Sequence, residues 1–235
     1  QLGLCGRRGQ RPKTQPLVQR RTPGRNVRSR TKLSAPLALL SFAGIDFGAK
    51  TAGTTAWCQL GPQGWVWEQC PKGQDADRWL EQMVQSHSPQ ALFIDAPLSL
   101  PRACIAPNPQ GDFAYRSADR QLQAMSPMFL GGLTARAMRL ACRFREQGIP
   151  CHEVYPAHCA SLLFPKPWYK KGKYRLSDLF AALSPRLPQP LPSMEQLNEH
   201  RFDALLAWFT GYQHQLGNSE WIGDPKEGCV LTIRI

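Results

Sequence analysis

Two apolar segments that each end in an aspartate constrain the fold of this chain more than any other feature. Residues 36–46 and 91–95, PLALLSFAGID and ALFID, are apolar along most of their length instead of alternating. Such runs are typical of strands buried on both faces, as in parallel sheets. A glycine or a proline follows each aspartate within two residues, and both residue types tend to end strands. We therefore expect two buried strands that end at Asp46 and Asp95.

Turn signals and hydrophobic periodicity divide the remaining chain into further elements. The sequence Gly61-Pro62-Gln63-Gly64 predicts a hairpin turn. Ser193 and Gln196 match a capping box that opens a long helix ending near residue 215. The other expected strands span residues 54–60, 65–70, 149–155 and 231–235. The other expected helices span residues 75–86, 115–125, 134–147 and 174–183.

The order of these elements predicts the fold class. An early hairpin is followed by strands that return through helices, which gives an α/β domain with a mixed sheet flanked by helices. The RNase H-like sheet of five strands has this order. A stretch that begins rich in proline and glycine is expected as a helical insertion at about 102–133, inside a domain that covers residues 35–235.

Four acidic residues stand where a purely structural role is hard to assign. Asp46 and Asp95 end buried strands, Glu153 lies near the end of the next strand, and Asp203 interrupts the apolar helix RFDALLAWF. Parallel neighbouring strands lie about 4.8 Å apart and end at the same edge of a sheet, so these carboxylates would meet. Carboxylates that close repel one another unless a cation joins them, and hard oxygen ligands suit Mg²⁺ or Mn²⁺.

Each acid also has a structural alternative. Asp46 and Asp95 could accept backbone hydrogen bonds in the loops that follow, Asp203 could pair with Arg201, and Glu153 could be an exposed strand residue. Their joint placement favours a site for two ions roughly 3.5–4 Å apart, which together activate water and stabilise the leaving oxygen of a phosphodiester. Asp46, Asp95 and Asp203 are the expected metal ligands, and Glu153 is the expected fourth ligand or the base.

Positive charge is concentrated at the start of the chain. Residues 1–33 contain ten of the 29 Lys and Arg residues and no acid, whereas the remainder has 19 basic and 17 acidic side chains. The formal net charge of +12 therefore belongs mostly to one segment, which we expect to be a disordered tail over residues 1–34. A polyanion-binding arm, an organelle transit peptide and upstream sequence of little purpose all fit this segment.

The eight cysteines are scattered and form no CxxC pair. Cys151-His152 and His158-Cys159 come nearest to a zinc motif, but adjacent strand residues point to opposite faces, which disfavours a shared ion. Free buried thiols indicate a reducing compartment, so we expect a cytoplasmic location. No segment reaches the roughly 20 apolar residues of a membrane span, and no membrane association is expected.

Six segments occur together in the order seen in one known family. They are GIDFGAK at 44–50, FIDAPLSLP at 93–101, YRSADRQLQ at 115–123, HEVYPA at 152–157, RFDALLAW at 201–208 and IGDPKEG at 222–228. As a set they resemble domain-of-unknown-function family 429, whose members are predicted RNase H-fold nucleases, over about residues 38–235. The resemblance implies metal-dependent chemistry at Asp46, Asp95 and Asp203, with Glu153 as a fourth contributor.

The resemblance extends to Arg116 and Asp119 in the family's RxxD segment. It implies that they position a phosphate or a ligand carboxylate, and an intrachain salt bridge is the alternative. Asp224 in IGD also matches, with an open role. Residues 166–175 interleave basic and aromatic side chains, as in surfaces that track phosphates and stack bases, although a solvated basic loop would have the same composition. The lysines expected to contact substrate are Lys50, Lys170, Lys171 and Lys173.

These observations predict a nuclease or phosphodiesterase that depends on Mg²⁺ or Mn²⁺ and acts on DNA or RNA. GIDFGAKTAGTT at 44–55 also resembles the first phosphate loop of sugar-kinase-like ATP phosphotransferases, although 235 residues leave no room for their two large lobes. A catalytically silent nucleic-acid-binding module is the third possibility, and it predicts salt-sensitive binding without cleavage. Nothing in the sequence indicates protein partners.

Overall fold

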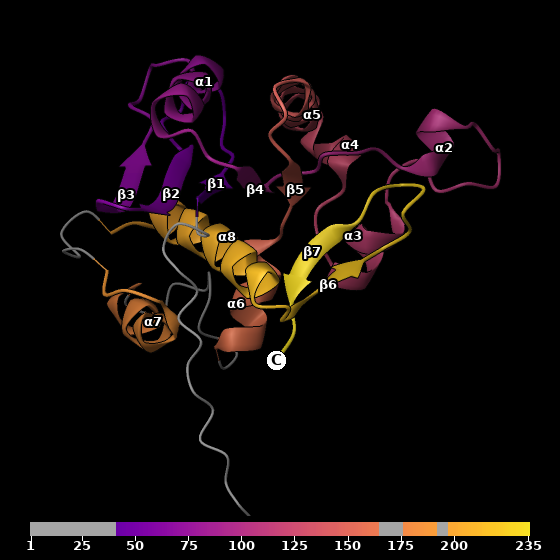
Figure 1. Ribbon diagram of the computed structural model, residues 1–235. Coiled ribbons are helices and arrows are strands. Elements are labelled where there is room, and N and C mark those ends of the chain that lie inside the picture. Colours follow the sequence, from indigo (N-terminus) through magenta and orange to yellow (C-terminus); the bar gives the residue numbers. More distant parts are fainter. Residues whose placement is uncertain (1–40, 165–175, 192–196) are drawn as a thin grey trace, which may run out of the picture. The chain divides into compact units, whose positions relative to one another are not determined.

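The computed structural model describes residues 41–164, 176–191 and 197–235. Within these residues the chain forms a mixed sheet of five strands in the order β3-β2-β1-β4-β5, with helices on both faces (Figure 1). The α/β class and the five-stranded mixed sheet that the sequence predicts are therefore confirmed. The basic segment 1–34 lies outside the described residues.

The two strands that end in aspartate are parallel neighbours at the centre of the sheet. β1 (Phe42–Asp46) pairs in parallel with β4 (Ala91–Asp95) and antiparallel with β2 (Ala56–Gly61). β3 (Gly64–Gln69) forms the expected hairpin with β2, and β5 (Cys151–Glu153) lies parallel to β4. β5 is shorter than the strand expected at 149–155. The parallel strands β1, β4 and β5 end at the same edge of the sheet, as the predicted site requires.

Helices bury both faces of the sheet. α1 (Ala76–His87) and α5 (Gly132–Glu146) pack on one face. α6 (Pro156–Leu163), α7 (Leu176–Leu183) and α8 (Glu199–Gln215) pack on the other (Figure 1). Successive strand residues point to opposite faces, and those of β1 and β4 enter both clusters in turn. Burial on two faces explains why these strands are apolar throughout rather than alternating.

Helix α8 approaches β1 closely because Gly44 has no side chain. A Cβ atom at this position would collide with the backbone of Ala204 and Trp208 in α8. Residues 202–212 of the helix are all buried, which is typical of a helix that runs through the interior of a domain. The close contact brings the first turns of α8 beside the end of β1.

Three short helices occupy the segment expected as an insertion at about 102–133. A 3₁₀ turn, η2 (Ser184–Arg186), lies in the proline-rich stretch after α7. The final strand pairs with a strand that the sequence analysis did not foresee, and a single bridge from Val154 to Leu231 joins this hairpin to the end of β5. The insertion helices are α2 (Arg102–Ile105), α3 (Ser117–Leu122) and α4 (Pro127–Leu130), and the hairpin strands are β6 (Ser219–Ile222) and β7 (Val230–Ile233).

The start of α8 differs from the prediction. The helix begins at Glu199, and the side chain of Asn198 accepts a hydrogen bond from the backbone N–H of Arg201 at 2.9 Å. Asn198 is therefore the N-cap, whereas the capping box was expected at Ser193 and Gln196, which lie outside the described residues. None of the helices in the described ranges is long and apolar enough to cross a membrane.

Candidate metal centre

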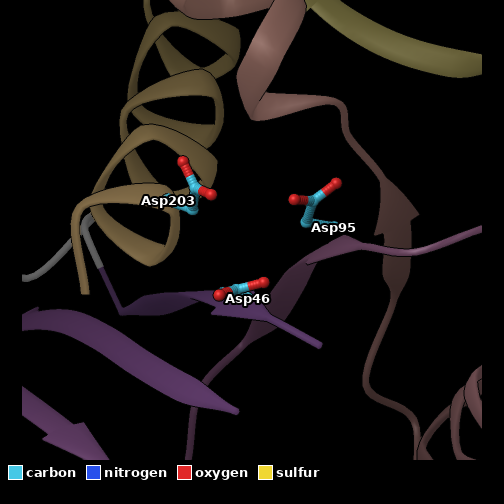
Figure 2. Close-up of side chains that lie close together, drawn as sticks. All are labelled: Asp46, Asp95 and Asp203. Atoms are coloured by element: carbon cyan, nitrogen blue, oxygen red, sulfur yellow. The ribbon is translucent and has the colours of Figure 1, made fainter. Parts of the chain in front are cut away.

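Asp46 and Asp95 lie side by side at one edge of the sheet. Each is the last residue of its strand, and the two are paired in the parallel register of β1 and β4. Both are half-buried. Residues paired across parallel strands point to the same face, so the two carboxylates leave the sheet together (Figure 2).

Asp203 reaches the same place from helix α8. Its side chain is buried, with 4% of the residue exposed. One carboxylate oxygen from each of Asp46, Asp95 and Asp203 lies within 4.8 Å of the other two, and Figure 2 shows the three groups gathered around a common space. In the part of the chain that the structure describes, this is the one group of three or more acidic, histidine or cysteine side chains with such spacing.

The spacing suits hard divalent cations. Mg²⁺–oxygen distances are about 2.0–2.1 Å, so two oxygens on one ion lie at most about 4.2 Å apart. The three oxygens fall within 4.8 Å, and a small side-chain rotation or a pair of neighbouring ions would accommodate them. Three carboxylates without soft ligands favour Mg²⁺ or Mn²⁺ over zinc.

A histidine that the sequence analysis missed holds Asp46 in place. His200 Nδ1 lies 2.8 Å from Asp46 Oδ2 and donates the hydrogen bond, since an ionised carboxylate can only accept. This hydrogen bond raises the pKa of His200 above its ordinary value. His200 and Asp203 are three residues apart on α8, so they share a helix face. That spacing was a signal the sequence contained.

The loop after β1 does not use Asp46 as its cap. The backbone N–H of Gly48 donates to the hydroxyl of Thr55, and that of Ala49 donates to the hydroxyl of Thr54, each at 3.1 Å. Arg136 of α5 holds the same loop from the other side, because its Nη1 donates to the carbonyl of Gly48 at 3.1 Å. The alternative in which Asp46 satisfies loop amides is thus not what the structure contains.

Glu153 is bound by an arginine instead of joining the three aspartates. Arg116 Nη2 lies 2.6 Å from Glu153 Oε1, and Nη1 lies 2.7 Å from Oε2. The backbone N–H of Leu98 also donates to Oε2, at 2.8 Å. Both oxygens of Glu153 are therefore engaged, which leaves it poorly placed to take the predicted role of ligand or base.

Arg116 is also paired with Asp119, so the salt-bridge alternative for the RxxD segment is the one observed. Arg116 Nη2 lies 2.7 Å from Asp119 Oδ1, and both side chains are 1% exposed. Burial opposes the charge on Arg116, but hydrogen bonds to Glu153 and Asp119 outweigh it and raise its pKa above the usual value. Burial raises the pKa of Glu153, and the hydrogen bonds from Arg116 counteract that rise. Both residues line the cavity beside the aspartates, and their predicted role in binding substrate stays a prediction.

A cavity of about 220 Å³ opens beside the acids. Asp46 and Asp95 line it, and the Arg116–Glu153–Asp119 network forms part of its wall. The buried network pairs one guanidinium with two carboxyl groups, so it adds no net positive charge to this wall. A cation is the natural complement of such a surface.

Two further candidates, Lys50 and Asp224, do not line this cavity. Lys50 is 52% exposed and its Nζ lies 3.2 Å from Asp75 Oδ2, where Asp75 caps helix α1. Asp224 accepts a hydrogen bond from the backbone N–H of Lys226 at 2.9 Å, which is typical of an Asx turn. Lys170, Lys171 and Lys173 lie outside the described residues.

The cysteines of the described ranges are all free thiols. Cys151 and Cys159 are buried, and burial raises the pKa of each to about 12. Thiols with such a pKa stay protonated at neutral pH.

Comparisons of this chain with protein-family models, curated proteins and solved structures gave no significant match. The resemblance to family 429 therefore stays a prediction, and any proposal of function rests on the geometry of the site.

Changing His200 to Ala is expected to weaken Mn²⁺ binding by about 10–100-fold, the usual cost of losing a side chain that orients a ligand. Without the 2.8 Å hydrogen bond, Asp46 must order its carboxylate when the ion binds. Isothermal titration calorimetry with MnCl₂ measures this affinity, with His158→Ala in α6 as the control. Equal affinity in both variants and in the unmodified protein would exclude this role of His200.

Proposed function

We propose that this chain is a phosphodiesterase with an RNase H-like sheet, and that it cleaves nucleic acid with Mg²⁺ or Mn²⁺ bound by Asp46, Asp95 and Asp203. The convergence of these three carboxylates carries the proposal. They come from three separated segments, and one oxygen of each falls within 4.8 Å of the others. Such a concentration of acid at the edge of a parallel sheet is costly for stability unless a cation joins it.

The chain's own residues supply a scaffold for the ions. Asp46 and Asp95 are fixed by the register of β1 and β4, Asp203 is fixed by the packing of α8, and His200 orients one oxygen of Asp46. A divalent ion bound there would supply Lewis-acid polarisation of the phosphoryl group and activation of water. Fixed ligands favour catalysis because little reorganisation is required during the reaction.

Glu153 has a different role in this proposal from the one expected. It anchors Arg116 and the backbone of Leu98, and so fixes the segment that follows β4 and Asp95. We assign Glu153 and Arg116 as positioning residues for the cavity wall. Asp46, Asp95 and Asp203 would hold the ion, and activation of the attacking water would be the chemistry that the ion supplies there.

The geometry disfavours ATP phosphotransfer. Phosphate loops bind their ligand with free backbone N–H groups. In the loop after β1, the N–H groups of Gly48 and Ala49 already donate to the hydroxyls of Thr55 and Thr54. A silent binding module is also less favoured, because binding alone would not call for three acids at one point.

Removal of metal tests the proposal. The purified protein is treated with EDTA, dialysed, and assayed on single-stranded DNA, single-stranded RNA and bis(p-nitrophenyl) phosphate. We expect no hydrolysis without metal and recovery with Mg²⁺ or Mn²⁺. Hydrolysis that is insensitive to EDTA would contradict the proposal. Saturable ATP binding by calorimetry, with no hydrolysis under any divalent ion, would favour phosphotransfer instead.

A further inference from the structure

The cavity beside the aspartates has two walls of opposite character. One wall carries Asp46, Asp95 and the Arg116–Glu153–Asp119 network. The other is apolar, and metal binding gives no reason for it. Its side chains come from the residue after β1, from the segment that runs through α4 into α5, from the loop after β5 and from the start of β7. The apolar lining includes Phe47, Met125, Leu130, Leu133, Tyr155 and Val230.

Hydrogen bonds fix the apolar wall in place. The hydroxyl of Ser126, which is buried, caps α4 by accepting from the backbone N–H of Met128 at 3.0 Å, and it donates to the carbonyl of Ala114. Thr134 Oγ1 in α5 donates to the carbonyl of Pro127 at 2.7 Å. These bonds tie α4 to α5 and to the loop before α3. The wall is therefore already formed without a ligand, as binding pockets usually are.

The size and the lining define what fits. The cavity of about 220 Å³ is smaller than the roughly 300–1,000 Å³ of drug-sized ligand sites. It holds one ring-sized group rather than a long chain. A phosphate gains nothing from an apolar wall, whereas a planar aromatic group gains from contact with leucine and with the soft thioether of methionine.

We propose that this pocket receives the base next to the cleaved phosphate, so that the substrate is an unpaired nucleotide unit. This inference rests on the proposed function, because the three aspartates would fix the phosphate from which the base extends. A paired base lies inside a duplex stack and cannot enter the pocket without being extruded. The enzyme therefore acts on single strands or free nucleotide esters and discriminates against duplexes.

Substrates that differ only in the base test the inference. A thymidine oligonucleotide and an oligonucleotide of abasic tetrahydrofuran units carry the same backbone charge. With the unmodified protein and Mn²⁺, we expect kcat/KM for the thymidine strand to be higher by about tenfold or more, in line with the usual contribution of one base contact. The length of the substrate separates the two substrate classes. If the thymidine dinucleotide is cleaved as fast per bond as the longer strand, the substrate class is a free nucleotide ester. If the longer strand is cleaved faster per bond, the substrate class is a single strand.

Adjacent residues of α4 provide a matched pair of variants. Leu130 lines the pocket, whereas Phe129 does not line it and is 69% exposed. Leu130→Trp fills the pocket, so we expect a loss of about tenfold in kcat/KM on the thymidine strand, mainly through KM. Its Mn²⁺ affinity and melting temperature should stay unchanged. Phe129→Trp should behave as the unmodified protein on both strands.

The outcomes separate this inference from the proposed function. Mn²⁺-dependent cleavage that is equal on thymidine and abasic strands overturns the base pocket and leaves the metal site standing. Full activity of Leu130→Trp on the thymidine strand would likewise overturn the base pocket and leave the metal site standing. Absence of any metal-dependent cleavage, in a folded protein that does not bind Mn²⁺, overturns both.

Discussion

Changing Asp46 to Asn is expected to reduce Mn²⁺-dependent phosphodiester cleavage by at least about 100-fold. The amide keeps the size of the side chain but removes one of the three carboxylates that lie within 4.8 Å of one another. Metal-ion stabilisation of a transition state is worth several kcal/mol, and each 1.4 kcal/mol or so is a factor of ten in rate. Initial rates on bis(p-nitrophenyl) phosphate, with and without MnCl₂, measure the effect.

A surface acid provides the control for this prediction. Glu146 is exposed at the end of α5, and Glu146→Gln removes the same charge without touching the site. Its rate should stay within about twofold of the unmodified protein. Undiminished activity of Asp46→Asn, measured beside this control, would refute the assignment of Asp46 as a ligand.

Changing Arg116 to Gln is expected to lower the free energy of unfolding by about 3–5 kcal/mol, the usual cost of breaking a buried ion pair from one side. Arg116 and Asp119 are 1% exposed, and Glu153 accepts two hydrogen bonds from the guanidinium. The substitution leaves two carboxylates buried without their cation. Urea denaturation followed by tryptophan fluorescence measures the change.

The destabilisation should depend on pH in a definite direction. Burial raises the pKa of Glu153, and the hydrogen bonds from Arg116 lower it, so loss of Arg116 leaves only the hydrogen bond from the Leu98 N–H to oppose burial. A carboxylate whose pKa is higher in the folded state than in the unfolded state destabilises the fold as pH rises past the unfolded pKa. The loss in free energy of unfolding caused by Arg116→Gln should therefore be smaller near about pH 5 than near about pH 7.

An exposed pair gives the comparison for this variant. Arg120 Nη2 lies 2.7 Å from Asp112 Oδ2, but the two side chains are 61% and 41% exposed. Arg120→Gln should cost less than about 1 kcal/mol, as surface ion pairs usually do. Equal and small losses in both variants would show that the buried network contributes little to stability.

The neighbouring positions of Asp46 and Asp95 were predictable because strand physics determines them. A continuous apolar run indicates a strand buried on both faces, and parallel strands end at one edge of the sheet. The register then pairs the two residues. Asp203 was also recognisable, because an acid inside an apolar helix needs a partner or a cation. None of these inferences required knowledge of side-chain packing.

The roles of Glu153 and His200 were not predictable in the same way. Glu153 stands near a strand end like the two aspartates, but Arg116 reaches it from 37 residues away in the sequence. His200 meets Asp46 from 154 residues away. Such pairs depend on how loops and helices pack. The three-residue spacing of His200 and Asp203 places both on one face of the helix, but it does not specify the contact with Asp46. The N-cap of α8 is Asn198. Ser193 is also a residue type that caps helices, so the sequence alone does not select between the two.

The most direct test of the account is the position of Mn²⁺ in a crystal of this protein soaked in MnCl₂. The account predicts anomalous density between the carboxylates of Asp46, Asp95 and Asp203, with oxygen–metal distances of about 2.2 Å. Density confined to other sites, with these three side chains turned apart and each paired to a basic residue, would contradict it.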